Sequence, residues 1–350
     1  MSAITERIRD AVSTREPSLT SRVVVAVMIG VFGALVAAGQ YNGKSGFHTD
    51  FGMLWFGARA LFHGMDPYPL IGPGREFNYA WPLIYPLPAV VSVMPLAIFT
   101  ERVAATFFVA VSSALLCFGL TRDGWYRVPL FISEAFLSSA RLGQLSILLT
   151  AALFLPWLAT FAIAKPQSSI PVIAGSVSRR PIVFAIVGGI VLLAISTVLQ
   201  PHWIPSWIAG IRNAKHMEPP ITRFAGFLVL LVLLRWRRPE SWLVLSLACL
   251  PQSWGWYGTL PLFTVPSTFA QSVFLAGVAT VGGNIAAMVI PGHPTADGFY
   301  YWAGSVLILT IYLPVVLLIL RRPNEGPLPS WIEIIASIRE RRSQSSTRSD

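Results

Sequence analysis

The fold is decided by residues 181–199, which read PIVFAIVGGIVLLAISTVL. The run carries no charged side chain, and a helix built from it is apolar on every face. A helix needs roughly 20 mostly apolar residues to cross the hydrocarbon core of a bilayer, so the run predicts a membrane-spanning helix. A strand of an outer-membrane barrel would instead alternate apolar and polar residues.

The composition of the whole chain extends this conclusion. Of the 350 residues 12% are charged and 54% are hydrophobic, and the mean hydropathy is +0.62. A soluble domain has roughly 25% charged residues, so that class is excluded. We predict an all-α, polytopic transmembrane bundle of about 10–12 spans. The predicted spans are 22–40, 83–100, 102–120, 128–141, 144–164, 167–178, 181–199, 221–234, 241–254, 257–271, 272–291 and 299–320.

The net charge of +10 is located at the ends of apolar runs. Arg179 and Arg180 precede the run at 181–199, and Arg321 and Arg322 follow the last run. Lys and Arg gather in the cytoplasmic loops of membrane proteins. Twelve spans with both tails inside put 17 of the 26 basic residues on the cytoplasmic side. The charge therefore indicates orientation in a membrane, and no nucleic-acid partner is predicted.

Three parts are predicted along the chain. Residues 1–21 form a cytoplasmic amphipathic tail, 22–320 the transmembrane domain and 321–350 a basic cytoplasmic tail. Apolar residues recur at helical spacing beside arginines in both tails, which is typical of helices on anionic lipid. The first run also fits a cleaved signal peptide, although an uncleaved span is the simpler interpretation.

The long first extracytoplasmic loop, 41–82, contains the best-placed carboxylate. Thr49 or Asp50 can cap a helix that Gly64 ends. This helix is apolar on most faces, with Arg59 as its one charge, so we expect it in the outer interface. Asp50 is then either an N-cap alone or a reactive carboxylate near the membrane surface.

Five features follow one another from this loop onward: Asp50, ALFHGMDPY at 60–68, Tyr85-Pro86 with MPLA at 94–97, Gly143-Gln144, and Lys165-Pro166-Gln167. In this order they resemble the polyprenyl-phosphate-mannose-dependent mannosyltransferases of the GT-C fold (glycosyltransferase family 87, DUF2029-like). The resemblance covers roughly residues 22–320. PQSWGWY at 251–257 resembles a later Trp-containing segment of the family. The chain departs from the family at Tyr257, where a His or Asp is frequent, and at Ser146, where an Asn is common.

The resemblance implies a hexosyltransferase on the extracytoplasmic face of a cell membrane, of the bacterial inner-membrane type. It would move a hexose, mannose in the best-known case, from a polyprenyl-phosphate donor to a glycolipid or glycan hydroxyl, with inversion and without a cofactor. Such chemistry needs a base for the acceptor's proton and cations for the phosphate charge. We expect Asp50 as the base and Lys165 with Arg59 at the phosphate. An ordinary snorkelling lysine is the alternative for Lys165.

Candidates for the substrate pocket are His48, Tyr68, Gln144, Trp254 and Tyr257. Aromatic residues near the outer ends of spans stack on sugars or belong to the interfacial belt of a membrane protein. No HxH or HxxxH spacing occurs, so no metal is predicted.

Two rival functions stay open. A lipid or solute transporter, or a flippase, would use the same outer cavity and would carry ionisable groups at mid-depth, where the sequence offers only Glu134. Glu134 also fits a hydrogen-bonded packing residue. A non-catalytic membrane assembly protein would tolerate the loss of Asp50 and Lys165 equally.

Overall fold

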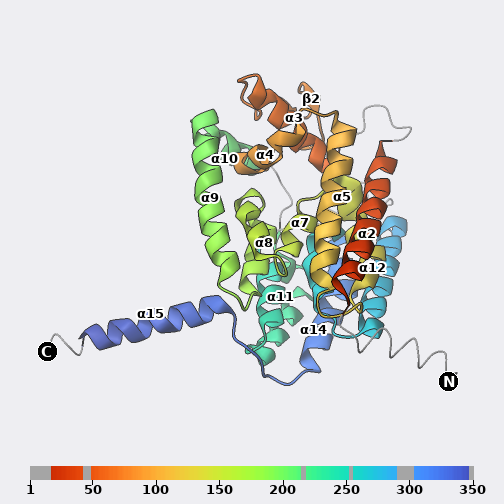
Figure 1. Cartoon of the computed structure of the whole chain (residues 1–350), viewed down its shortest axis with the longest axis vertical. Coiled ribbons are helices and arrows are strands. Elements are labelled where there is room, and N and C mark those ends of the chain that lie inside the picture. Colours follow the sequence, from red (N-terminus) through yellow and green to blue (C-terminus); the bar gives the residue numbers. More distant parts are fainter. Residues whose placement is uncertain (1–16, 42–48, 214–217, 252–254, 290–302, 347–350) are drawn as a thin grey trace.

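The computed structural model describes residues 17–41, 49–213, 218–251, 255–289 and 303–346. This part of the chain is mostly helical (Figure 1), which confirms the all-α class. The two short strands β1 (Ile71–Gly72) and β2 (Phe77–Asn78) pair with each other. The fold is thus a helical bundle with one small β turn region.

Five helical segments in the described residues are long and apolar enough to cross a membrane, fewer than the 10–12 spans predicted. They are α2 (Leu19–Gln40), α5 (Glu101–Leu120), α9 (Arg180–Leu199), α12 (Phe269–Val289), and the run 303–320 with η8 (Ile308–Tyr312) and α14 (Leu313–Leu320).

The other predicted spans correspond to shorter helices. Proline at the first turn of most of them, as at Pro156 and Pro239, divides the apolar runs, because proline starts a helix readily and interrupts one that has begun. These shorter helices are α4 (Leu87–Val93), η1 (Met94–Leu96), η2 (Val128–Ile132), α6 (Glu134–Leu142), α7 (Ser146–Ala151), η3 (Pro156–Ala164), α8 (Pro166–Ala174), η4 (Pro220–Thr222), η5 (Gly226–Arg235), α11 (Pro239–Cys249) and η6 (Trp256–Thr264).

The bundle has two ends, which we name after residues that lie there. The Asp50 end carries α3 (Asp50–Phe62), α4 and α10 (Trp203–Asn213). The Arg22 end carries the beginning of α2 and the end of α5, where the Arg22 guanidinium donates to the Phe118 carbonyl at 2.6 Å. Helix α15 (Ser330–Ser346) leaves the bundle at this end and runs sideways (Figure 1).

Small residues let α2 and α5 approach each other closely. A Cβ on Gly33 would lie 2.6 Å from Ser113 Oγ, and one on Gly30 would lie 2.9 Å from the Ala110 carbonyl oxygen. Close approach through small residues is the usual way in which helices associate in lipid. The N-terminal helix is therefore part of the bundle.

The predicted span 83–100 is wrong, because both of its ends lie at the Asp50 end. The hydroxyl of Tyr85 contacts Gln144, and the Phe99 carbonyl accepts from the Trp55 indole of α3 at 3.0 Å. Pro86, Pro88 and Pro95 limit the helix to a short piece that lies beneath α3.

Three arginines consequently lie at the opposite end of the bundle from the one predicted. Arg102 was predicted on the cytoplasmic side but lies beside Glu101, whose carboxylate accepts from the Tyr41 hydroxyl at the Asp50 end. Helix α5 begins there and runs to the Arg22 end. Arg122 and Arg127, which follow the helix, therefore lie at the Arg22 end. Those two residues were predicted on the outer side.

The predicted span 144–164 is a hairpin. Gln144, its first residue, and Lys165, the residue after it, are joined by a hydrogen bond, so the run returns to the place where it began. Its turn lies toward the Arg22 end, because Phe154 packs against Gly119 near the end of α5. Hydropathy alone does not distinguish such a hairpin from a single span.

Glu134 begins α6 and forms an ion pair with Arg141 of the same helix at 2.8 Å. Ser133 caps this helix by accepting from the Phe136 amide. The structure thus gives Glu134 a hydrogen-bonded partner, as the packing interpretation predicts.

Candidate active site

Asp50 is the first residue of α3, but it does not cap the helix. Thr49 is the N-cap, and its Oγ1 accepts from the Gly52 amide at 3.1 Å. The Asp50 carboxylate accepts instead from the Tyr79 hydroxyl and from the Gln144 amide nitrogen. The interpretation of Asp50 as an N-cap alone is therefore wrong.

Gln144 connects Asp50 to Lys165. Its Oε1 accepts from Lys165 Nζ at 2.5 Å and from the Tyr85 hydroxyl at 3.4 Å. An ammonium only donates and an ionised carboxylate only accepts, so the two charges fix which way the amide points. Gln144 is 94 residues from Asp50 and 21 from Lys165 in sequence, yet one amide touches both.

Lys165 is buried, with 4% of its surface exposed. Its Nζ lies 4.8 Å from the centroid of the Tyr257 ring and 6.0 Å from that of Tyr85, which are cation–π distances. A snorkelling lysine would hold its ammonium in water. The structure therefore contradicts the snorkelling interpretation and makes Lys165 part of a built polar cluster.

Burial shifts both ionisable groups of this cluster, which lie outside the five candidate spans. Burial raises the pKa of the Asp50 carboxyl, while the Tyr79 hydrogen bond, the Lys165 charge and the Gln144 hydrogen bond act against the shift. Burial lowers the pKa of Lys165 to about 8, and the Asp50 charge opposes that shift. Each group favours the charged form of the other.

Gly143 turns the chain so that Gln144 reaches Asp50. Helix α6 ends there at φ +63°, a left-handed conformation that glycine adopts without strain, and the Gln144 amide donates back to the Ser139 carbonyl at 2.9 Å. A Cβ on Gly143 would lie 2.6 Å from the Phe51 Cβ, beside Asp50.

Gly143→Ala is therefore expected to lower the free energy of unfolding by about 1–3 kcal/mol through backbone strain and overpacking. Thermal unfolding in detergent measures the loss. The matched control is Gly277→Ala, because a Cβ there would meet no atom within 4 Å. Equal melting temperatures for the two variants would contradict the assigned role of Gly143.

Arg59 is not brought to this cluster. It lies nine residues beyond Asp50 on α3, which is about 13.5 Å along the axis and about half a turn away. The side chain is exposed and stacks on Trp55, with 5.1 Å from the guanidinium carbon to the ring centroid. Its predicted phosphate contact has no support in this geometry.

Tyr68 contacts the cluster only through Tyr85, because its hydroxyl donates to the Tyr85 carbonyl at 3.1 Å. Tyr257 lies beside Lys165, as described above. His48 and Trp254 lie outside the described residues.

Tyr79 and Tyr85 are site residues that sequence reasoning did not select. Tyr85 belongs to the Tyr-Pro feature of the resemblance, which is a usable signal. Tyr79 follows β2 and meets Asp50 across 29 residues of sequence, and no motif marks it.

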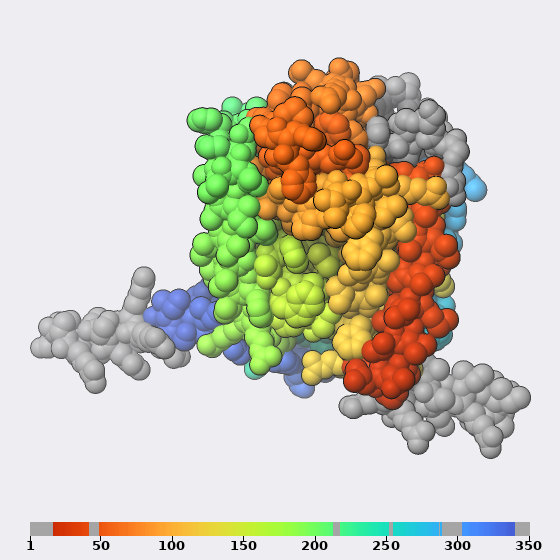
Figure 2. Space-filling view, turned by 45° about the horizontal axis from the view of Figure 1, so that its top comes forward, coloured from red at the N-terminus to blue at the C-terminus, as the bar shows by residue number. Residues whose placement is uncertain are grey.

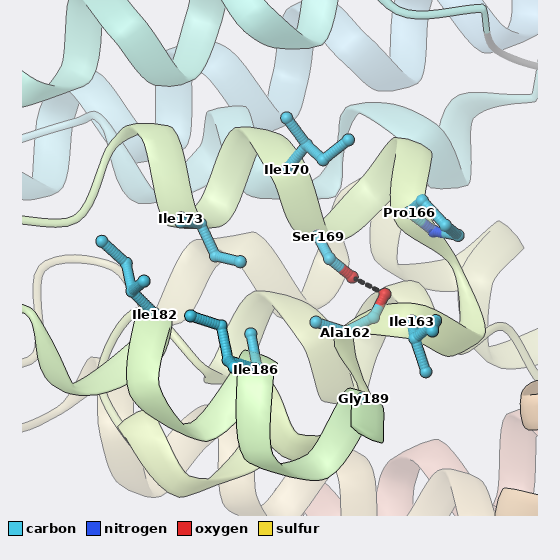
Figure 3. Close-up of a pocket in the computed structure, with 10 residues that line it drawn as sticks. Ala162, Ile163, Pro166, Ser169, Ile170, Ile173, Ile182, Ile186 and Gly189 are labelled. Atoms are coloured by element: carbon cyan, nitrogen blue, oxygen red, sulfur yellow. Dashed lines mark hydrogen bonds between the residues drawn. The ribbon is translucent and has the colours of Figure 1, made fainter. Parts of the chain in front are cut away.

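An apolar groove lies beside Pro166, the residue after Lys165 (Figure 3), with a volume of about 330 Å³. Its one polar side chain, Ser169, donates to the carbonyls of Ala162 and Lys165. The hydroxyl hydrogen is thus used within the protein, and the other lining side chains are apolar, so the groove suits hydrocarbon. It is lined by Ala162, Ile163, Pro166, Ser169, Ile170, Ile173, Ile182, Ala185, Ile186 and Gly189.

Residues from α3 to α4 cover one end of the bundle (Figure 2, orange). Beneath them, the segment that carries Lys165 and α8 (yellow-green) fills the surface between α9 and α5. The apolar groove thus adjoins the chain next to Lys165 of the polar cluster.

The cluster contains a carboxylate, which can accept a proton, and a buried ammonium, which can bind an anion. In the described part of the chain, no group of three or more His, Cys, Asp or Glu side chains is placed to hold a metal ion. No protein-family model, curated protein or solved structure matches the chain.

Proposed function

We propose that the chain is a multi-pass membrane glycosyltransferase of GT-C type that moves a hexose from a polyprenyl-phosphate donor to an acceptor hydroxyl. One observation carries the proposal. Asp50, Gln144 and Lys165 belong to separate features of the sequence resemblance, and they meet in one hydrogen-bonded cluster.

The proposed reaction is a single displacement with inversion. The acceptor oxygen forms a bond to the anomeric carbon while the bond from that carbon to the phosphate oxygen breaks. The phosphate leaves with the bonding electron pair, and the Lys165 ammonium stabilises the charge that develops on it. Asp50 takes the proton of the acceptor hydroxyl.

The arrangement of charge supports an orientation for this reaction. The Arg22 end carries Arg179, Arg235 and Arg322 in addition to Arg22, and the exchange of Arg102 for Arg122 and Arg127 adds to that excess. We therefore infer that the Arg22 end is cytoplasmic and that Asp50 faces the extracytoplasmic side.

The direct test incubates membranes containing the chain with labelled polyprenyl-phosphate sugars and identifies the labelled product. Transfer of the sugar to a glycolipid or glycan supports the proposal. An unchanged donor with every candidate sugar contradicts it.

The groove beside Pro166 is proposed to hold the first part of the donor's hydrocarbon chain. Gly189 forms part of the groove wall, and a Cβ added there would lie 3.9 Å from Ile163 Cδ1, so a larger side chain would extend into the groove. Gly189→Phe is expected to raise the KM for a long-chain donor roughly tenfold, because two buried CH₂ groups contribute about 0.8 kcal/mol each.

A short-chain donor, which would not reach the groove, is expected to keep its KM in the Gly189→Phe variant. Val187→Phe is the matched control, because Val187 is exposed on the same helix outside the groove. An equal effect on both donors, or the same effect from Val187→Phe, would count against this role.

Transport is the second candidate, because one observation favours it. Helices α7, α8 and α11 are too short to span a bilayer, and interrupted helices often form the binding sites of transporters. A flippase predicts that labelled lipid crosses the bilayer of a proteoliposome chemically unchanged, whereas a transferase converts it.

A further inference from the structure

Helix α10 follows α9 closely in the chain but does not continue it. Pro201 interrupts the helix, and the indole nitrogen of Trp203 lies 3.5 Å from Thr197 Oγ1 near the end of α9. Helix α10 then lies beside α4 at the Asp50 end (Figure 1). The chain therefore turns where α9 ends.

One face of α10 holds the helix against the bundle. Trp203 is buried, and the Trp207 indole donates to the Ile84 carbonyl at 2.9 Å. A Cβ on Gly210 would lie 2.9 Å from the Leu83 carbonyl oxygen. Residues three and four apart share one helix face, so positions 203, 207 and 210 form a single contact surface. Most of the length of α10 thus runs across the Asp50 end.

The neighbouring face of α10 is an exposed apolar stripe. Ile204, Ile208 and Ile211 repeat the same spacing, and their exposed fractions are 46%, 40% and 37%. Each residue of a helix is about 100° from the one before, so the stripe lies one step around α10 from the contact surface. Arg212 is exposed one step further around. Single exposed isoleucines are ordinary on a protein surface, but three in line on one helix mark an interaction face.

The position of α10 coincides with one edge of the bilayer that α9 can span. Helix α9 has 20 residues, which makes it about 30 Å long, the thickness of the hydrocarbon core. It begins at Arg180 at the Arg22 end, and Ile195 and Val198 near its other end are exposed. Helix α10 begins four residues after Leu199, so its stripe extends the exposed apolar surface of α9 at the opposite edge.

We propose that α10 is an in-plane helix that inserts Ile204, Ile208 and Ile211 into the lipid leaflet at the Asp50 end. A helix in the membrane interface buries its apolar face at the acyl boundary and keeps its polar face in water, and tryptophan is enriched at this depth. Arg212 reaches toward the lipid headgroups from the next face, as long basic side chains do at an interface. The proposal does not depend on sugar transfer.

The test uses the full chain reconstituted in liposomes of phosphatidylcholine and phosphatidylglycerol. Cys249 is exposed and is replaced by serine, whereas Cys117 is buried, so one added cysteine carries a bimane fluorophore. Ile208→Cys reports on the stripe. Ala209→Cys is the matched control, because Ala209 is also exposed and lies on the face of Arg212.

Quenching by a doxyl-labelled lipid is expected to be about threefold stronger at position 208 than at position 209, because an in-plane helix buries only one face. Aqueous iodide should give the reverse order, and Ile204→Cys should behave as Ile208→Cys does. Unchanged melting temperatures show that the labelled variants fold. Equal iodide quenching at 208 and 209 would place the stripe in water. Protection of 208 from both quenchers would place it against protein, such as a second copy of the chain. Either result overturns the proposal.

Discussion

Asp50→Asn is expected to reduce sugar transfer by about a thousandfold, within the usual range of 10²–10⁴ for the loss of a general base. Asparagine has nearly the shape of aspartate, and its side-chain oxygen still accepts a hydrogen bond from Tyr79 or Gln144. It does not take up the acceptor's proton. The rate of transfer from a labelled polyprenyl-phosphate sugar measures the effect.

Glu76→Gln is the control for Asp50→Asn, because Glu76 is an exposed carboxylate between β1 and β2 at the same end of the bundle. We expect this variant to transfer sugar at the wild-type rate. Both variants are melted in detergent, so that lost folding is separated from lost chemistry. An Asp50→Asn variant that melts normally and transfers sugar at full rate would exclude Asp50 as the base.

Lys165→Gln is expected to reduce kcat by roughly a hundredfold to a thousandfold, with a smaller change in the KM for the donor. The phosphate gains charge as its bond to the sugar breaks, so the ammonium stabilises the transition state more than the bound donor. Glutamine keeps much of the side-chain volume and offers donors to Gln144 Oε1, but it carries no charge. Steady-state kinetics across donor concentrations separate the two parameters.

The pH dependence of the transfer rate distinguishes a charged role of Lys165 from a packing role, because a packing role would give no change with pH. Burial lowers the pKa of Lys165 to about 8, so the ammonium is present below that pH and is lost as the pH rises through it. Transfer should fall over the same range. Lys165→Arg keeps its charge at all these pH values, so a variant that folds should lose this alkaline decline. An unchanged alkaline decline in Lys165→Arg would assign the titration to another group.

The sequence predicts the three residues of the hydrogen-bonded cluster correctly but does not predict the position of Arg59. Asp50, Gln144 and Lys165 each stand in a recognisable feature, and the fold brings the three together. Arg59 was selected by its charge and by its predicted place on the outer side. Its spacing of nine residues from Asp50 already indicates the opposite face of a helix, because nine residues make about 2.5 turns.

The predicted spans fail where an apolar run turns back inside the bundle. Residues 83–100 and 144–164 are as apolar as a lipid-facing helix, since burial against protein and burial in lipid select the same side chains. Their prolines were the available signal, at Pro86, Pro88, Pro95 and Pro156. Tyr79 could not be found in this way, because its contact with Asp50 depends on how the chain between α3 and α4 folds.

The hairpin between Gln144 and Lys165 has a consequence for the synthesis of the protein. All three polar side chains of the cluster belong to the first 165 of 350 residues. The carboxylate, amide and ammonium are therefore synthesised before any residue of α9 or η6. The Tyr257 ring, which lies over the ammonium, arrives 92 residues after Lys165. Tyr257, from the second half of the chain, thus packs on a polar cluster whose three residues were synthesised earlier.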